Sequence, residues 1–395
     1  MMTLCASALL AGQPQRGGAI FRSNSLASAK SGPPRNMVRP PQEKITASEW
    51  QTPHPGWLYV MDYNSGLSGS DGHVLLVDPN NGHVVGRLIV GSTPDMVLSP
   101  NGKRLYVASI LNTGDTLAVI DTANGAIRQS VPIHHRAKYT SMPDAPIIAI
   151  SPDGLWVYLL RMRTISPLHD EFTLASFDVA RGVFLPDEAV LPGCVSGLIF
   201  PSPDSQHIHV LCRGSNDVHF LLQTQNGLQT LPPPLPLSLP GEVQMIPATG
   251  ALSPEGNILA IGSHAGGVLE VLEIDVGTGP AGHVLARLPD NWVPARGVAQ
   301  SPDLERLYVA VGQISKRNTG KAESVLILDT RTGQELKHWR TNHSFWSLAI
   351  SPDGQLLYQV DPESQTIFEF DTTTYQEVRT INGIGMVPSR IVVAP

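Results

Sequence analysis

One cassette recurs along this chain at a nearly constant spacing, and it limits the fold more than any other feature. Each copy has an apolar run, then Ser-Pro-Asp-Gly or a variant, then a second apolar run that often contains Leu-Tyr-Val. Successive Ser-Pro pairs are separated by 52, 51, 51, 48 and 50 residues. The six pairs begin at Ser99, Ser151, Ser202, Ser253, Ser301 and Ser351. A strand-built repeat of about 50 residues is typical of the blades of a β-propeller.

Each cassette contains enough apolar runs for four strands. In residues 98–110 (LSPNGKRLYVASI), Pro and Gly favour a tight turn between two runs rich in β-forming residues, which predicts an antiparallel hairpin. A third run ends in Asp, and a turn and a fourth strand follow. We expect these Asp side chains to accept hydrogen bonds from the turn backbone, which is a structural role. They are Asp78, Asp121, Asp178, Asp275, Asp329 and Asp371.

The two ends of the chain complete the count of blades. Residues 57–90 contain only the last three strands of a unit, and residues 389–395 (SRIVVAP) form an apolar strand whose Ala-Pro stands where Ser-Pro would fall. The sequence therefore predicts an all-β fold, a seven-bladed β-propeller of four-stranded antiparallel blades, closed by the C-terminal strand completing the first blade. We expect residues 51–395 to form the propeller. Residues 1–50 are expected to be a disordered N-terminal extension that carries a candidate signal remnant.

Charge and cysteine usage exclude several classes of function. The net charge of −7 provides no basic surface for nucleic acid. There is no run of about 18 apolar residues, so no transmembrane segment is expected. The three cysteines, Cys5, Cys194 and Cys212, do not form a metal-binding cluster, and we expect no metal and no cofactor in this chain.

Cys194 and Cys212 are candidates for a disulfide. They lie nine residues on either side of Pro203, at the centre of an expected hairpin turn, so antiparallel pairing would place them nearly opposite each other. Opposed Cα atoms in such a pair are about 4.5–5.5 Å apart, which a disulfide permits. A bridge implies an oxidising compartment, periplasmic or extracellular. The alternative is a pair of reduced, buried thiols in a cytoplasmic protein.

No catalytic residues can be assigned, because the sequence lacks G-x-S-x-G, H-E-x-x-H, P-loop and Rossmann motifs. The best binding candidates lie where the innermost strands enter the central channel: Asp95, Arg296, Trp346 and Arg390. Two guanidinium groups and an indole ring suit an anionic or carbonyl-bearing ligand. The alternative is a salt bridge from Asp95 to an arginine that only fills the channel.

The cassettes resemble YVTN-type, WD40-like propeller repeats, although WD dipeptides are absent. Residues 57–395 resemble more specifically the heavy (β) chain of quinoprotein amine dehydrogenases, the methylamine and aromatic amine enzymes. The resemblance rests on the two cysteines with LCRGS (residues 211–215), on the long loop and strand at residues 312–336, and on the closing SRIVVAP strand. It implies a periplasmic seven-bladed propeller that holds small light chains. In that family the cysteine-rich light chain carries a tryptophan-derived quinone, so this chain, with three cysteines, corresponds to the other subunit.

Three functions follow from the sequence. The first is a non-catalytic β-propeller scaffold or binding subunit that presents loops to a partner protein such as a quinone-bearing light chain. If this chain is part of an enzyme, the resemblance implies an amine dehydrogenase complex. The alternatives are a propeller enzyme of lactonase type acting at the central channel, or a cell-envelope YVTN-repeat binding protein.

Overall fold

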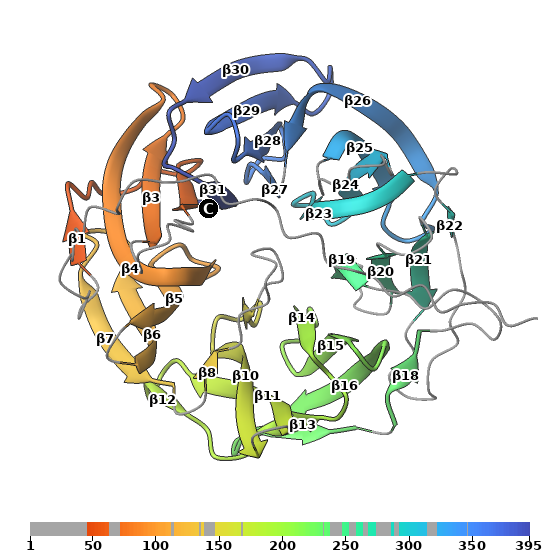
Figure 1. The fold of residues 1–395 in the computed structure, drawn as a ribbon. Helices are drawn as coiled ribbons and strands as arrows, with labels where there is room; N and C mark the ends of the chain where they lie inside the picture. The colour runs from red at the N-terminus through yellow and green to blue at the C-terminus, as the bar shows by residue number, and fades with distance from the viewer. Residues whose placement is uncertain are drawn as a thin grey trace, which may run out of the picture. The chain divides into compact units, whose positions relative to one another are not determined.

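The computed structural model describes residues 46–62, 72–111, 114–133, 136–137, 147–166, 169–231, 233–237, 247–252, 258–263, 268–273, 286–287, 292–313, 322–345 and 347–395. All of them lie in one compact unit, Pro41–Pro395. Every regular element among the described residues is a β-strand, and neighbouring strands pair antiparallel. The all-β propeller predicted from the repeats is confirmed, and Figure 1 shows its sheets following one another around a centre.

The first sheet is the largest and contains both ends of the described chain. Its order is β31-β2-β3-β4-β5-β6-β7, and β1 pairs with β4. Its strands are β1 (Thr46–Ser48), β2 (Leu58–Asp62), β3 (Gly72–Asp78), β4 (His83–Leu98), β5 (Arg104–Leu111), β6 (Gly114–Asp121), β7 (Ile127–Pro132) and β31 (Pro388–Val393).

The next two sheets have irregular edges. The second consists of β8 (Arg136–Ala137), β9 (Ile148–Ile150), β10 (Trp156–Ser166), β11 (His169–Asp178), β12 (Val183–Phe184) and β13 (Ala189–Leu191). The third consists of β14 (Ser196–Pro201), β15 (His207–Arg213), β16 (Asp217–Gln223), β17 (Leu228–Thr230) and β18 (Leu235–Pro236).

The last three sheets each have four strands in sequence order. The fourth consists of β19 (Pro247–Leu252), β20 (Ile258–Ser263), β21 (Val268–Glu273) and β22 (Ala286–Arg287). The fifth consists of β23 (Trp292–Gln300), β24 (Arg306–Gln313), β25 (Ala322–Asp329) and β26 (Glu335–Phe345). The last consists of β27 (Ser347–Ile350), β28 (Leu356–Asp361), β29 (Thr366–Asp371) and β30 (Glu377–Asn382).

The structure has six hydrogen-bonded sheets, so the expectation of seven separate sheets is wrong. The cause is β4, which is continuous over 16 residues. Its first part pairs with β3 as far as Gly91, opposite Gly72, and its second part pairs with β5 from Ser92, opposite Ile110. Pairing therefore passes from one neighbour to the other without a break, and one sheet of eight strands results.

The C-terminal strand closes the ring, as the sequence predicted. β31 pairs with β2 in an antiparallel register that places Val393 opposite Leu58 and Ile391 opposite Val60. In Figure 1 the C-terminus lies near the centre, beside the first sheet. A strand contributed by the chain end removes the open edge that β2 would otherwise present.

Asp62, the last residue of β2, holds the connection that leads into β31. Its carboxylate is 2% exposed and accepts hydrogen bonds from the backbone N–H groups of Met386 (2.8 Å) and Val387 (2.7 Å). Burial alone would raise the Asp62 pKa, but these bonds and the side chain of His73 outweigh it and lower the pKa below its usual value. Gly385 has a φ of +67°, and a Cβ there would lie 2.5 Å from Asp62 Cγ, so this turn requires glycine.

The Ser-Pro-Asp-Gly turns are stabilised by their own side chains. Ser351 Oγ accepts the backbone N–H of Leu356 (2.9 Å) and donates to Asp353 (2.5 Å). Ser151 makes the same two bonds, at 3.0 and 2.5 Å. Because a few neighbouring residues satisfy each of these turns, the motif folds in the same way in these two copies.

Successive turns also contact one another. A Cβ added at Gly354 (φ +73°) would lie 3.2 Å from Pro302, the proline of the preceding turn. The corresponding contact at Gly102 is with Pro395, at 2.8 Å. The terminal Ala-Pro therefore occupies the place of the missing Ser-Pro turn, as the sequence predicted.

A hydrophobic cluster seals the junction between the last sheet and the first. It contains buried side chains from both sheets and from the closing strand: Leu58, Val60, Leu75, Val77, Ala349, Tyr358, Val360, Ile367, Ile381, Ile384 and Ile391. Burying an aliphatic or aromatic side chain of this size stabilises the fold by about 1.5–3 kcal/mol. Ring closure therefore rests on packing as well as on backbone pairing.

The sheet begins earlier than the domain boundary expected at residue 51. β1 pairs with β4, with Ala47 opposite Leu88, so residues 46–48 belong to the first sheet and not to the N-terminal extension. Residues 1–45 of that expected extension lie outside the described residues.

Candidate functional site

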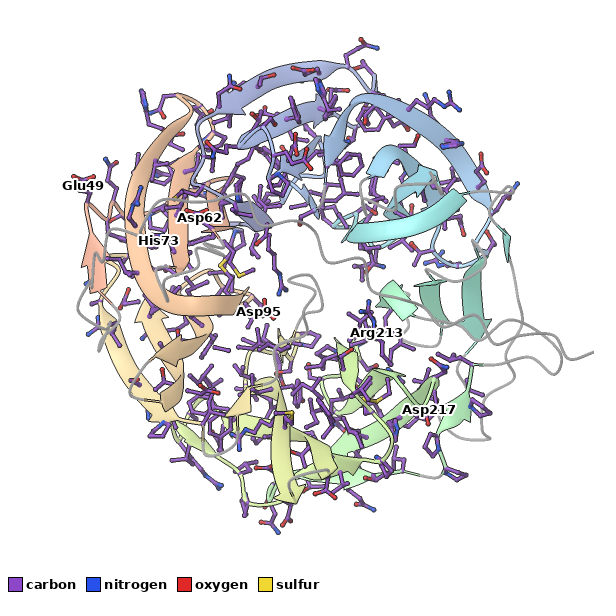
Figure 2. The ribbon with its side chains drawn as sticks, viewed as in Figure 1. Glu49, Asp62, His73, Asp95, Arg213 and Asp217 are labelled. Carbon is purple, nitrogen blue, oxygen red and sulfur yellow. A yellow bond between two sulfur atoms is a disulfide. The ribbon has the colours of Figure 1, made fainter. Side chains whose placement is uncertain are left out.

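Two of the four predicted channel residues meet in the structure. Asp95 is carried by β4 and Arg390 by β31, and Arg390 Nη1 donates a hydrogen bond to Asp95 Oδ1. In Figure 2, Asp95 lies at the inner edge of its sheet, facing the centre. The C-terminal strand therefore contributes one member of a charged pair at the channel.

Backbone N–H groups also donate hydrogen bonds to the Asp95 carboxylate. Oδ1 accepts the N–H of Met96 (2.8 Å), and Oδ2 accepts the N–H groups of Ile147 (2.7 Å) and Ile148 (3.3 Å). Asp95 is only 7% exposed. It thus links its own strand, the start of the second sheet and the closing strand at a single point.

This geometry corresponds to the ion pair that the sequence left open as the alternative to a ligand site. Burial lowers the pKa of Arg390 to about 10, so the guanidinium remains charged at neutral pH. A charged pair whose acid already accepts three backbone N–H groups is suited to holding strands together. A general base would instead need a free oxygen directed at a substrate proton.

The side chains of the other two predicted channel residues, Arg296 and Trp346, lie outside the part of the chain that the structure describes. Arg296 is on β23, where the pairing register with β24 shifts between Pro294 and Val298, and its side chain is outside the described part of the chain. Trp346 lies outside the described residues. The proposed stacking face and second guanidinium therefore stay predictions.

Arg213 is a further cation at the channel that the sequence reasoning did not select. It ends β15, opposite Ser196 on β14, and Figure 2 places it toward the centre. The sequence contained a signal for it, because LCRGS places an arginine at the end of an apolar strand, just before a turn.

Cys194 and Cys212 form a disulfide with a Cα–Cα distance of 5.1 Å. The expected register is wrong, however, because Cys212 pairs with Gly197, and Cys194 lies before β14 begins. The difference arises because the hairpin turn is centred between residues 204 and 205 and not on Pro203. The bridge therefore ties the turn that precedes β14 to β15.

One group of potential metal ligands exists among the described residues: Cys212, Asp217 and His219. The disulfide removes the Cys212 sulfur as a thiolate ligand. His219 Nε2 lies 3.1 Å from Asp217 Oδ1, so the other two side chains contact each other. The arrangement is a buried histidine–carboxylate contact beside a disulfide.

The recurring strand-end aspartates have the structural role that the sequence predicted. Asp371 Oδ1 accepts the backbone N–H groups of Thr373 (2.9 Å) and Thr374 (2.6 Å), and the Thr374 bonds lower the Asp371 pKa. Asp329 makes equivalent bonds to its own turn, at 3.0 and 2.8 Å. Asp275 lies outside the described residues. These carboxylates are occupied by turn backbone and do not form a catalytic series.

No residue that the structure describes belongs to a helix with the length and apolar character needed to traverse a bilayer.

Comparison with protein families relates the C-terminal part of the chain to one group. Residues 282–394 match the family model of the methylamine dehydrogenase heavy chain. The methylamine dehydrogenase heavy chain of Methylophilus methylotrophus is 31% identical over 110 residues, 27% of each chain. The chain is thus similar to about a quarter of the length of the curated relatives it matches.

Solved structures resemble a much larger part of the chain. A proposed 6-phosphogluconolactonase from Bacteroides fragilis has a TM-score of 0.62 at 14% identity, covering 85% of this chain and 97% of that one. The periplasmic gluconolactonase of Pseudomonas aeruginosa has a TM-score of 0.61 at 18% identity, covering 86% and 99%. At these identities the likeness shows the fold alone. The chain is a β-propeller with a C-terminal segment resembling the methylamine dehydrogenase heavy chain.

Proposed function

We propose that this chain is a non-catalytic propeller subunit of the amine dehydrogenase heavy-chain type, which presents its loops to a smaller, quinone-bearing partner. One observation carries the proposal: residues 282–394 match the methylamine dehydrogenase heavy-chain model. That segment extends from β22 through the closing strand β31. It includes the strand that completes the first sheet, so the match spans the ring junction.

The channel pair supports a binding role over a catalytic one. Asp95 and Arg390 bond each other, and the Asp95 carboxylate also accepts three backbone N–H groups. Using either group in catalysis would require breaking contacts that connect β4, β9 and β31. A partner that brings its own redox group makes no such demand on this chain.

The ring is proposed to contain seven blades. The eight-stranded sheet includes two sets of four: β31, β2, β3 and the first part of β4, then the second part of β4, β5, β6 and β7. Each set has the strand number of the regular sheets that end the chain. Together with the five other sheets, these two sets give seven.

Export to the periplasm or another oxidising compartment is part of the proposal. It is supported by the Cys194–Cys212 disulfide, because structural disulfides persist in oxidising compartments and are rare in the cytosol.

The test is purification of the tagged chain from its native source, followed by assays of the purified complex and of the chain separated from its partners. We expect a smaller, cysteine-rich protein with quinone absorbance to copurify, and the complex to reduce a dye when an amine is added. The chain alone should be colourless and inactive toward amines and lactones. The result that overturns the proposal is lactone hydrolysis by the isolated chain, lost in a folded Arg390→Gln variant, which would indicate a lactonase.

A further inference from the structure

A cavity of about 300 Å³ lies where the last sheet meets the first, away from the Asp95–Arg390 pair. We call it the seam pocket. The last sheet contributes Tyr358, Glu369 and Arg379 and its Ser-Pro turn contributes Asp353, whereas Pro55 and Pro79 line the opposite side. Only ring closure brings these residues together, because the two sides are about 300 residues apart in the sequence.

The polar wall of the seam pocket is a ladder across three adjacent strands. Tyr358 on β28 is directly opposite Glu369 on β29, and Glu369 is directly opposite Arg379 on β30. Cross-strand partners project from the same face of a sheet. That face packs against the first sheet, because Tyr358 belongs to the hydrophobic cluster that contains Leu58 and Val60.

Glu369 is an exception within the internal repeats of the chain. Tyr106, Tyr158 and Tyr308 occupy the same place in their cassettes as Tyr358, six residues after the proline of Ser-Pro. The residues directly opposite those three tyrosines are Val119, Ser176 and Ile327. A carboxylate therefore stands where the other described sheets with this tyrosine carry an apolar or small side chain.

The Glu369 carboxylate is buried without a complete set of partners. It is 4% exposed, and its Oε2 has no hydrogen-bond partner in the structure. Burial raises the Glu369 pKa, although the charge of Arg379 partly opposes this shift. Arg379 directs Nη1 to the backbone carbonyl of Pro79, across the junction. A buried carboxylate with an unoccupied oxygen is costly, and a ligand that donates N–H groups would relieve that cost.

The rest of the pocket indicates what kind of ligand fits. The carboxylates of Glu369 and Asp353 and the guanidinium of Arg379 leave an excess of negative charge when Glu369 is ionised. The rest of the lining consists of proline rings, Gly56, the side chain of Leu356 and two neutral polar residues, Asn80 and Ser351. Aromatic faces attract cations, so the Tyr358 ring would favour a positive head group as well.

We propose that the seam pocket binds a small organic cation through a primary ammonium group. The ammonium donates hydrogen bonds to Glu369, and its carbon chain packs against the proline and tyrosine rings. This inference goes beyond the proposed function, and none of the seam pocket residues belongs to the channel pair.

The experiment is calorimetric titration of the full chain with n-butylammonium chloride, compared with n-butanol and with sodium chloride. We expect saturable binding of the ammonium salt only. Glu369→Gln keeps the side-chain shape but removes the charge, and it should weaken binding about tenfold or more. The matched control is Glu377→Gln, on β30 outside the pocket, which should leave the affinity unchanged.

A second variant covers the case in which Glu369→Gln fails to fold. Glu369→Leu places an apolar residue where the related sheets have Val119 and Ile327, so it should raise the unfolding temperature and abolish binding. Equal binding of butanol and butylammonium would overturn the proposal. So would no binding by the unmodified chain, or unchanged affinity in both Glu369 variants.

Discussion

The contact between Asp95 and Arg390 should couple the stabilities of β4 and β31, and a double-mutant cycle measures this coupling. Asp95→Ala removes the acceptor for the backbone N–H groups of Met96, Ile147 and Ile148 and leaves Arg390 without its carboxylate. Each buried donor left unpaired costs about 1–3 kcal/mol, and breaking a buried ion pair costs about 3–5 kcal/mol. Because these effects overlap, we expect Asp95→Ala to reduce the free energy of unfolding by about 3–5 kcal/mol.

Arg390→Met should cost less, about 1–3 kcal/mol, because Asp95 keeps its backbone partners and only the charged contact is lost. The coupling energy between the two substitutions should then be about 1–3 kcal/mol. The assay is denaturant unfolding followed by tryptophan fluorescence and circular dichroism, and coincident transitions permit a two-state treatment.

A surface ion pair provides the control for this cycle. Arg128 Nη2 lies 2.7 Å from Asp121 Oδ2, and the Arg128 side chain is 56% exposed. Its coupling energy should be below about 1 kcal/mol, because solvent screens exposed pairs. If the Asp95 and Arg390 substitutions are additive within about 0.5 kcal/mol, the reasoning that this pair ties the closing strand to the channel is refuted.

Three other predictions concern the ring junction and the disulfide. The Asp62 pKa is lowered in the folded state, so the ionised carboxylate stabilises the fold fully at neutral pH, and this stabilisation is lost as the pH falls below about 4. Asp62→Asn should flatten this acid dependence of the unfolding temperature in thermal melts. Gly385→Ala should lower the unfolding temperature, because its Cβ would collide with Asp62, whereas Gly383→Ala, with nothing within 4 Å of the added Cβ, should lower it less. Replacing Cys194 and Cys212 together by Ala should cost about 3 kcal/mol in denaturant unfolding, since the bridge closes a loop with a sequence separation of 18; equal stability of this variant and the parent would contradict that.

Features that depend on a few neighbouring residues were predictable from the sequence. The Ser151 turn and the Asp371 turn are satisfied by side chains within five residues, so local composition determines them. The closing strand was also predictable, because one unit lacked its first strand and the chain ended with a matching apolar run. Residues 389–395 and residues 57–62 then had one obvious arrangement.

Features that depend on exact register or on distant packing were not predictable in this way. The hairpin between β14 and β15 turns slightly later than expected, so Cys194 lies outside the strand although its bridge to Cys212 forms. The pairing of Asp95 with Arg390 was one of two open alternatives, since composition alone does not decide whether charges at a channel bond each other or a ligand. The seam pocket was not predicted, because Glu369 lies within an otherwise apolar strand. The burial of Glu369 becomes evident only when the last sheet packs on the first.

Closure by the C-terminal strand underlies the channel pair, the seam pocket and the comparison with heavy-chain propellers. The most direct measurement is thermal unfolding of the chain with residues 389–395 deleted, repeated with the peptide SRIVVAP added in excess. A variant lacking only Pro395 serves as the control, because it retains the whole of β31. We predict a large fall in unfolding temperature on deletion, partial recovery with the peptide, and a smaller fall for the control. An unfolding temperature equal to that of the full chain would contradict the account.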